Sequence, residues 1–220
     1  MSTGKLIVIE GTDGSGKTTQ TNLLIERFKK EGVPSQSIRF PQYESNLGGK
    51  LIRESLDGKH GDFTKVDPKI GSVLYALDRF ETMPKMKGWI EEGKIIVADR
   101  YTTSNQIHQG GKLRDEKDRA DFLDWLGVLE YEKLGVMKPD VVFYLDMPFE
   151  VSEELISKRE GIKDAADSDF EYLRNSKEAG KYMLERESFW IKVECMNGER
   201  LMTPEEIHEK IWEKVQDAIK

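Results

Sequence analysis

Short runs of apolar residues alternate along this chain with longer stretches whose apolar residues recur every three or four positions. Leu6–Ile9, Ile95–Ala98 and Val141–Leu145 are continuous apolar runs with the length of a strand that is buried on both faces. Ser37–Phe40 and Trp190–Cys195 are weaker candidates for strands. Because such runs are separated by helical stretches, the pattern predicts an α/β protein with a parallel sheet.

Helices are predicted between these runs and at the end of the chain, over about 18–30, 47–56, 68–92 and from 204 onward. The second-last of these is expected to bend at Pro84. The last has a clear start signal, with Thr203 as N-cap, Pro204 at the first helical position and Glu206 at the third. Its predicted buried stripe is Ile207, Ile211, Val215 and Ile219.

Composition narrows the class of protein. Hydrophobic residues make up 37% of the 220 residues and charged residues 34%, which predicts one globular domain over residues 1–220. The net charge of −7 argues against general nucleic-acid binding. One cysteine, Cys195, and three scattered histidines disfavour a zinc site and indicate a reducing compartment. Since no apolar run is long enough to span a membrane, the cytoplasm is the expected location.

The first apolar run leads into a phosphate-binding loop. Residues 11–18, GTDGSGKT, fit the pattern G-x-x-x-x-G-K-[ST] at every fixed position. Glycines let backbone N–H groups turn toward phosphate oxygens, and the helix that follows points its positive end at them. Lys17 would reach the β- and γ-phosphates, and the Thr18 hydroxyl would bind Mg²⁺. The predicted ATP-binding residues are Gly11, Thr12, Asp13, Gly14, Ser15, Gly16, Lys17, Thr18 and Thr19.

Four further segments follow the loop in a fixed order. They are RFPQY (39–43), LYALDRF (74–80), ADRYTTSNQIHQGG (98–111) and DSDFEYL (167–173). Asp99 and Arg100 stand where a strand ends, which is the edge at which α/β sheets bind ligands. Together with the phosphate loop, these segments closely resemble the thymidylate kinase family. The resemblance covers the chain from Lys5 to about Tyr182.

The resemblance implies a three-layer P-loop kinase fold, with a central five-stranded parallel sheet flanked by helices and a mobile lid over about 158–170. It implies transfer of the γ-phosphoryl group of ATP to dTMP, which gives dTDP for dTTP synthesis. The acceptor residues that it implies are Asp13, Arg39, Phe40, Pro41, Tyr43, Tyr75, Arg79, Arg100, Ser104, Asn105 and His108.

Several of these positions carry individual roles in the family. Tyr75 matches the aromatic residue that stacks on thymine, and Arg79 matches the arginine that contacts the edge of the base. Arg39 and Arg100 match ligands of the acceptor phosphate. Asp13 matches a carboxylate beside the sugar 3′-hydroxyl. Asn105 is expected to face the pyrimidine ring, and His108 the C2′ side of the sugar.

Catalysis and metal binding are expected at the phosphate loop, the strand edge and the lid. The implied catalytic residues are Lys17, Arg100, Arg159 and Asp13, and the implied Mg²⁺ ligands are Thr18, Asp99 and Asp167. Gly14 stands where some members carry a basic residue. The transition-state cation is therefore expected from the lid, as Arg159 together with Lys158 or Lys163. A homodimer is implied as well, through apolar faces in Ile70–Leu77 and Phe122–Leu134.

The residues leave four other functions open. Another mononucleotide kinase or a deoxynucleoside kinase would share the phosphate loop, although an unphosphorylated acceptor does not need both Arg39 and Arg100. A regulatory GTPase is a different class, but the chain has no Asn-Lys-x-Asp element to recognise guanine. A nucleotide-binding scaffold without catalysis conflicts with the apparent completeness of the catalytic set.

Overall fold

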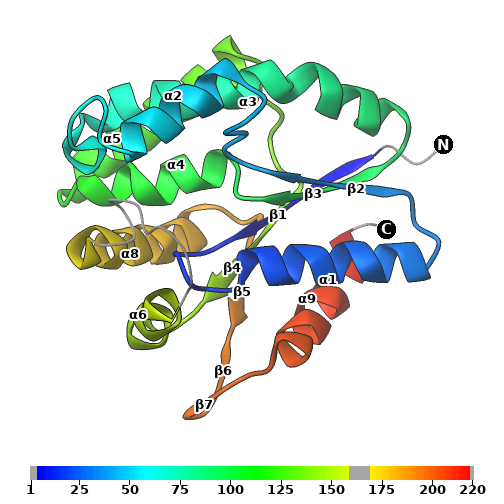
Figure 1. The fold of residues 1–220 in the computed structure, drawn as a ribbon. Coiled ribbons are helices and arrows are strands. Elements are labelled where there is room, and N and C mark those ends of the chain that lie inside the picture. Colours follow the sequence, from blue (N-terminus) through cyan, green and yellow to red (C-terminus); the bar gives the residue numbers. More distant parts are fainter. Residues whose placement is uncertain (1–3, 159–168, 219–220) are drawn as a thin grey trace.

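The fold is a parallel β-sheet between two layers of helices (Figure 1). The structure is a computed structural model that describes residues 4–158 and 169–218. The five strands lie in the order β2-β3-β1-β4-β5, and each pairs in parallel with its neighbours. Their bounds are β1 Lys5–Glu10, β2 Ser35–Arg39, β3 Ile95–Asp99, β4 Val141–Asp146 and β5 Trp190–Glu194. The α/β fold and the five-stranded parallel sheet are as predicted.

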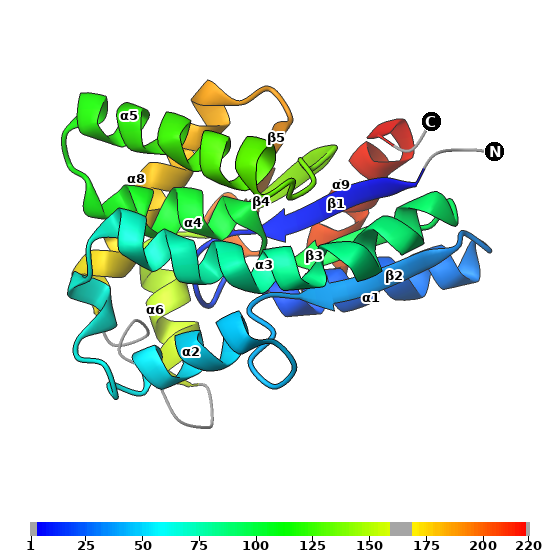
Figure 2. The same ribbon diagram turned by 90° about the horizontal axis from the view of Figure 1, so that it is seen from above.

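Helices cover both faces of the sheet (Figures 1 and 2). On one face, apolar residues of α1 and α9 pack against Ile7, Ile9, Val97 and Phe143. On the other face, α3, α4, α5 and α8 pack against alternate residues of the same strands, such as Val8 and Ile96. The helix bounds are α1 Lys17–Lys30, α2 Leu47–Leu56, α3 Pro68–Glu91, α4 Thr102–His108, α5 Glu116–Gly127, α6 Phe149–Ser157, α8 Phe170–Arg186 and α9 Pro204–Ala218.

Several short elements connect these layers. Two 3₁₀ turns lie at η1, Phe63–Lys65, and η2, Gly110–Lys112. A π-helical turn, η3 Val128–Lys133, follows α5 directly. The strands β6 Met196–Asn197 and β7 Arg200–Leu201 form a small hairpin before α9. In the described ranges, no helix has the length and apolar character needed to cross a membrane.

The predicted start signal of the last helix is confirmed. The Thr203 hydroxyl accepts from the Glu206 N–H at 3.3 Å, and the Glu206 carboxylate accepts from the Thr203 N–H at 2.7 Å, which is the reciprocal capping box. Ile207, Ile211 and Val215 are buried against the sheet, while Ile219 lies outside the described residues. Helix α3 runs on through Pro84 as one helix.

The carboxyl ends of β1, β2 and β3 meet at one edge of the sheet. In the register, Asp99 of β3 lies opposite Ile9 of β1 on one side and Arg39 of β2 on the other. The phosphate loop leaves this edge after β1, and the segments that carry Pro41 and Arg100 leave it after β2 and β3. Topology therefore brings the sequence segments of interest to one place.

Candidate active site

The phosphate loop wraps around the amino group of Lys17. This Nζ donates to the carbonyl oxygens of Gly11 and Thr12, both at 2.8 Å, and lies 3.9 Å from the Asp13 carboxylate. Burial, followed by the charge of Arg100, lowers the pKa of Lys17 to about 8. Helix α1 begins at Lys17 itself, so its first N–H groups and its positive dipole end face the loop.

Gly14 has no room for a side chain. Its φ is 79°, and a Cβ built there would lie 2.7 Å from the carbonyl oxygen of Ser152 in α6. Both the left-handed backbone and the close approach of α6 therefore favour glycine at this position. The close packing of α6 therefore explains why this loop position carries no basic side chain.

Thr18 and Asp99 form an oxygen pair beside the loop. The Thr18 hydroxyl donates to Asp99 Oδ2 at 2.6 Å, and Arg39 Nε lies 3.7 Å from the same oxygen. The other carboxylate oxygen, Asp99 Oδ1, is buried and has no hydrogen-bond partner among the described residues. A hydroxyl and a carboxylate fit Mg²⁺, which takes a few protein oxygens and completes its shell with phosphates and water. The third predicted ligand, Asp167, lies outside the described residues.

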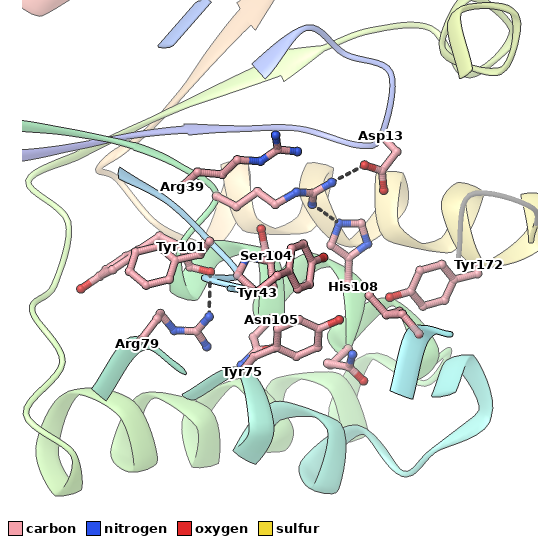
Figure 3. Close-up of a pocket in the computed structure, with 15 residues that line it drawn as sticks. Asp13, Arg39, Tyr43, Tyr75, Arg79, Tyr101, Ser104, Asn105, His108 and Tyr172 are labelled. Atoms are coloured by element: carbon pink, nitrogen blue, oxygen red, sulfur yellow. Dashed lines mark hydrogen bonds and ion pairs between the residues drawn. The ribbon is translucent and has the colours of Figure 1, made fainter. Parts of the chain in front are cut away.

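Arg100 has an unusual backbone conformation. Within residues 4–158 and 169–218, it is the one non-glycine residue with positive φ, at 67°. Its guanidinium donates to Asp13 and contacts His108 Nε2 at 3.0 Å, as the dashed lines in Figure 3 mark. Burial opposes its charge, but the carboxylates of Asp13, Glu10 and Asp99 keep the pKa of Arg100 above its ordinary value. The phosphate loop, through Asp13, and helix α4, through His108, thus fix the orientation of the guanidinium group.

One cavity contains every residue predicted to bind the acceptor (Figure 3). It lies between the strand edge and helices α2, α3 and α4, and Tyr75 forms part of its wall with Phe63 behind it, ring centroids 6.0 Å apart. The predicted residues that line it are Asp13, Arg39, Phe40, Pro41, Tyr43, Tyr75, Arg79, Arg100, Ser104, Asn105 and His108. The remaining lining residues are Leu56, Tyr101, Gln109 and Tyr172. Phe40 joins Pro41 through a cis peptide bond.

Arg79 is anchored by a buried carboxylate that the sequence did not indicate. Its Nε and Nη2 donate to the two oxygens of Glu130 at 2.6 and 2.7 Å, and its Nη1 donates to the carbonyl of Tyr101 at 3.3 Å. Asn105 Nδ2 also donates to Glu130, at 3.0 Å, and to the Ser72 carbonyl at 3.2 Å. Burial opposes the charge of Arg79, while Glu130 raises its pKa. Glu130 therefore fixes both side chains at the base of the cavity.

Glu10 connects the phosphate loop to α4. This buried carboxylate accepts from the N–H of Gly11 at 3.0 Å and from the hydroxyls of Thr103 and Ser104 at 2.6 and 2.7 Å. Because both hydroxyls donate to it, the start of α4 is tied to the beginning of the loop.

Gln109 is one of the four residues lining the acceptor cavity that the sequence did not indicate. Its Oε1 is buried without a hydrogen-bond partner in the described part of the chain, and the residue lines the acceptor cavity. The signal that could have found it is its place directly after His108 and before two glycines, Gly110 and Gly111. Glu10 and Glu130 had no comparable signal, because an isolated glutamate is usually exposed.

A second cavity surrounds the phosphate loop and meets the first. It is lined by residues 13–20 of the loop and α1, by Met147 and Leu155, and by Leu201, Met202, Pro204 and Ile207 near the start of α9. Asp13, Arg39 and Arg100 line both cavities. These three side chains therefore form a shared wall between the phosphate-loop cavity and the acceptor cavity.

The predicted lid cations are only partly within the described residues. Arg159 and Lys163 lie outside them. Lys158 is described; its exposed amino group forms an ion pair with Glu154 on α6. Beyond the gap, Asp169 caps α8, and its carboxylate accepts from the N–H of Tyr172 at 3.0 Å.

Comparison with known proteins identifies the family. The family model for thymidylate kinase matches residues 9–211. A probable thymidylate kinase of Thermococcus kodakarensis is 36% identical over 177 residues, 78% of this chain and 80% of that protein. A probable thymidylate kinase of Thermococcus gammatolerans is 31% identical over 221 residues, 98% of each. The structure of thymidylate kinase from Candida albicans has the same fold, with a TM-score of 0.77, 99% of this chain and 94% of that chain covered, and 23% identity. The chain belongs to the thymidylate kinase family.

Proposed function

We propose that this chain transfers the γ-phosphoryl group of ATP to dTMP, with ADP and dTDP as products, in the biosynthesis of dTTP. Family membership supports the reaction and the two nucleotides. The observation that carries the proposal is the shared wall of Asp13, Arg39 and Arg100 between the two cavities. A donor in one cavity and an acceptor in the other would place their reacting phosphates at this wall.

The donor half uses the phosphate loop. Lys17 would exchange the carbonyl oxygens of Gly11 and Thr12 for β- and γ-phosphate oxygens, which offer it a stronger, charge-assisted contact. Thr18 and Asp99 would hold Mg²⁺, whose charge offsets that of the phosphates.

In the acceptor cavity, dTMP would bind with its phosphate at the shared wall and its thymine base away from the wall. Tyr75 would stack on the base, while the Nη1 of Arg79 and the amide of Gln109 face its polar edge. Arg39 and Arg100 would bind the phosphate, and Asp13 would accept from the 3′-hydroxyl. The bidentate geometry of a guanidinium suits a phosphate group.

The chemistry needs positioning and positive charge more than covalent help. An acceptor phosphate oxygen must lie in line with the γ-phosphorus, and cations must offset the charge of its equatorial oxygens. Lys17 and Arg100 supply two such cations, and a lid cation such as Arg159 is proposed as a third. No general base is required, because the acceptor phosphate is already ionised at neutral pH.

We also propose that residues 1–220 form one domain that acts as a homodimer. Helix α3 presents Ile70, Val73 and Phe80 to solvent with exposures of 63%, 46% and 48%. These positions fall along one side of the helix, as expected for a face that a second copy covers. In the other candidate stretch, Phe122 and Leu126 are buried in the core of the same chain, which leaves α3 as the proposed interface.

A nucleotide panel and an Arg100 variant test the function. In a coupled assay for ADP, dTMP is expected to be turned over faster than AMP, GMP or CMP; equal or faster turnover of one of those would overturn the proposal. Arg100→Ala is expected to abolish most turnover while ATP binding remains. Arg186→Met is the matched control. Arg186 is the last residue of α8, about 21 Å along the helix from Tyr172, and its guanidinium pairs with the exposed Asp124 of α5.

A further inference from the structure

A chain of hydrogen bonds runs from Arg100 to helix α8. Arg100 Nη1 lies 3.0 Å from His108 Nε2, and His108 Nδ1 lies 3.1 Å from the hydroxyl of Ser176. The Ser176 hydroxyl lies 2.8 Å from the carbonyl oxygen of Tyr172, one turn earlier in α8. The Tyr172 ring stacks on the imidazole, with centroids 5.6 Å apart and planes 15° from parallel.

The chemistry of these groups fixes the direction of every hydrogen bond. A guanidinium only donates, so His108 Nε2 accepts and carries no proton. A carbonyl only accepts, so the hydrogen of Ser176 points to Tyr172 and its oxygen is left to accept from His108 Nδ1–H. The opposite tautomer would place two N–H groups against each other at Arg100. Ser176, which accepts from Nδ1–H, therefore stabilises the same tautomer that the contact with Arg100 requires.

The surroundings keep this imidazole neutral. His108 is 8% exposed, and burial together with the charge of Arg100 lowers its pKa to about 3. The other charged groups that act on it are Asp13, Lys17 and Lys112. A neutral acceptor can orient Arg100 without neutralising it, whereas the second contact of Arg100, with Asp13, is an ion pair.

We propose that His108 is a positioning residue, which orients the guanidinium of Arg100 toward the acceptor phosphate through a tautomer that Ser176 stabilises. Helix α8 would in this way set the geometry of the phosphate contact without touching the substrate phosphate. The inference rests on the proposed role of Arg100 in binding that phosphate.

The kinetic test compares variants that keep or remove the acceptor atom. His108→Phe retains a ring to stack on Tyr172 but cannot accept from Arg100, so kcat/KM for dTMP should fall about tenfold or more. His108→Gln can offer an amide oxygen and should keep kcat/KM within about threefold of wild type. KM for ATP should stay unchanged in both. Ser55→Ala is the matched control for Ser176→Ala, since the buried Ser55 hydroxyl also bonds the carbonyl four residues earlier, at 2.8 Å.

Nitrogen-15 NMR of the histidine rings gives a readout that a merely structural role would not move. In the wild-type protein at neutral pH, His108 should be protonated at Nδ1 and unprotonated at Nε2. Ser176→Ala should shift the population toward the other tautomer. A wild-type His108 protonated at Nε2, or His108→Phe with wild-type kcat/KM, would overturn the inference. If Arg100→Ala itself leaves turnover unchanged, the proposed function fails first, and the NMR result then stands alone.

Discussion

The buried pair of Arg79 and Glu130 allows a quantitative test of how the acceptor cavity is built. Both side chains are almost wholly buried, and two hydrogen bonds of 2.6 and 2.7 Å join them. Glu130→Gln retains the shape of the side chain but removes its charge, and deprives the buried guanidinium of Arg79 of the carboxylate that it is hydrogen-bonded to. Breaking a buried pair in this way costs about 3–5 kcal/mol.

This free-energy cost can be converted into an expected change in melting temperature, Tm. An unfolding entropy of about 2.1 cal/mol/K per residue gives about 0.46 kcal/mol/K for 220 residues. Glu130→Gln should therefore lower Tm by about 7–11 °C. Circular dichroism of purified wild type and variant measures the shift. Glu171→Gln is the control, because its pair with Arg114 is 68–74% exposed and its loss should change Tm by less than about 2 °C.

A double variant separates the pair from its parts. Arg79→Leu combined with Glu130→Met removes both charges, so no ion is left uncompensated, and most of the lost Tm should return. Turnover of dTMP should stay impaired, because the proposed base contact of Arg79 is gone. A Tm for Glu130→Gln within about 2 °C of wild type would refute the reasoning, as would a double variant less stable than either single one.

Three further results are expected. Gly14→Ala should raise KM for ATP about tenfold or more, because the added Cβ would collide with α6. Gly32→Ala is the control, since Gly32 has a similar φ of 71° but open space around it, and it should leave KM for ATP unchanged. Equal effects of the two substitutions would contradict the packing argument. Because Lys17 loses its charge as pH rises through about 8, kcat/KM for ATP should fall there, and a level profile up to its ordinary pKa of 10.5 would speak against its role. Phe80→Glu should give monomers in sedimentation velocity if α3 is the interface, and an intact dimer would exclude that face.

Much of the fold could be predicted because its signals are local. The buried strands β1, β3 and β4 were visible as apolar runs, and the capping box of α9 as a four-residue pattern. The edge strand β2 begins at Ser35, two residues before the predicted start, because its polar residues are half exposed and dilute the pattern. Edge strands are buried less completely, so hydrophobicity marks their ends poorly.

The acceptor cavity was predictable only in the residues that line it. The segments after the phosphate loop named those residues, and the structure brings them together. The carboxylates that hold them in place were not predictable. Glu130 sits in a π-helical turn, where the extra residue per turn changes which side chains face inward, and no 3.6-residue pattern predicts that change. Its burial depends on Arg79, 51 positions earlier in the chain.

The shared wall also couples the binding of the two nucleotides. Asp13, Arg39 and Arg100 border both cavities, so a ligand that moves any of them in one cavity alters the charge presented to the other. Thermodynamic linkage requires the effect to be reciprocal: whatever factor ATP applies to the affinity for dTMP, dTMP applies to the affinity for ATP. An inhibitor bound in one cavity is therefore expected to change the affinity of the other cavity for its nucleotide, and that nucleotide should change the affinity for the inhibitor by the same factor.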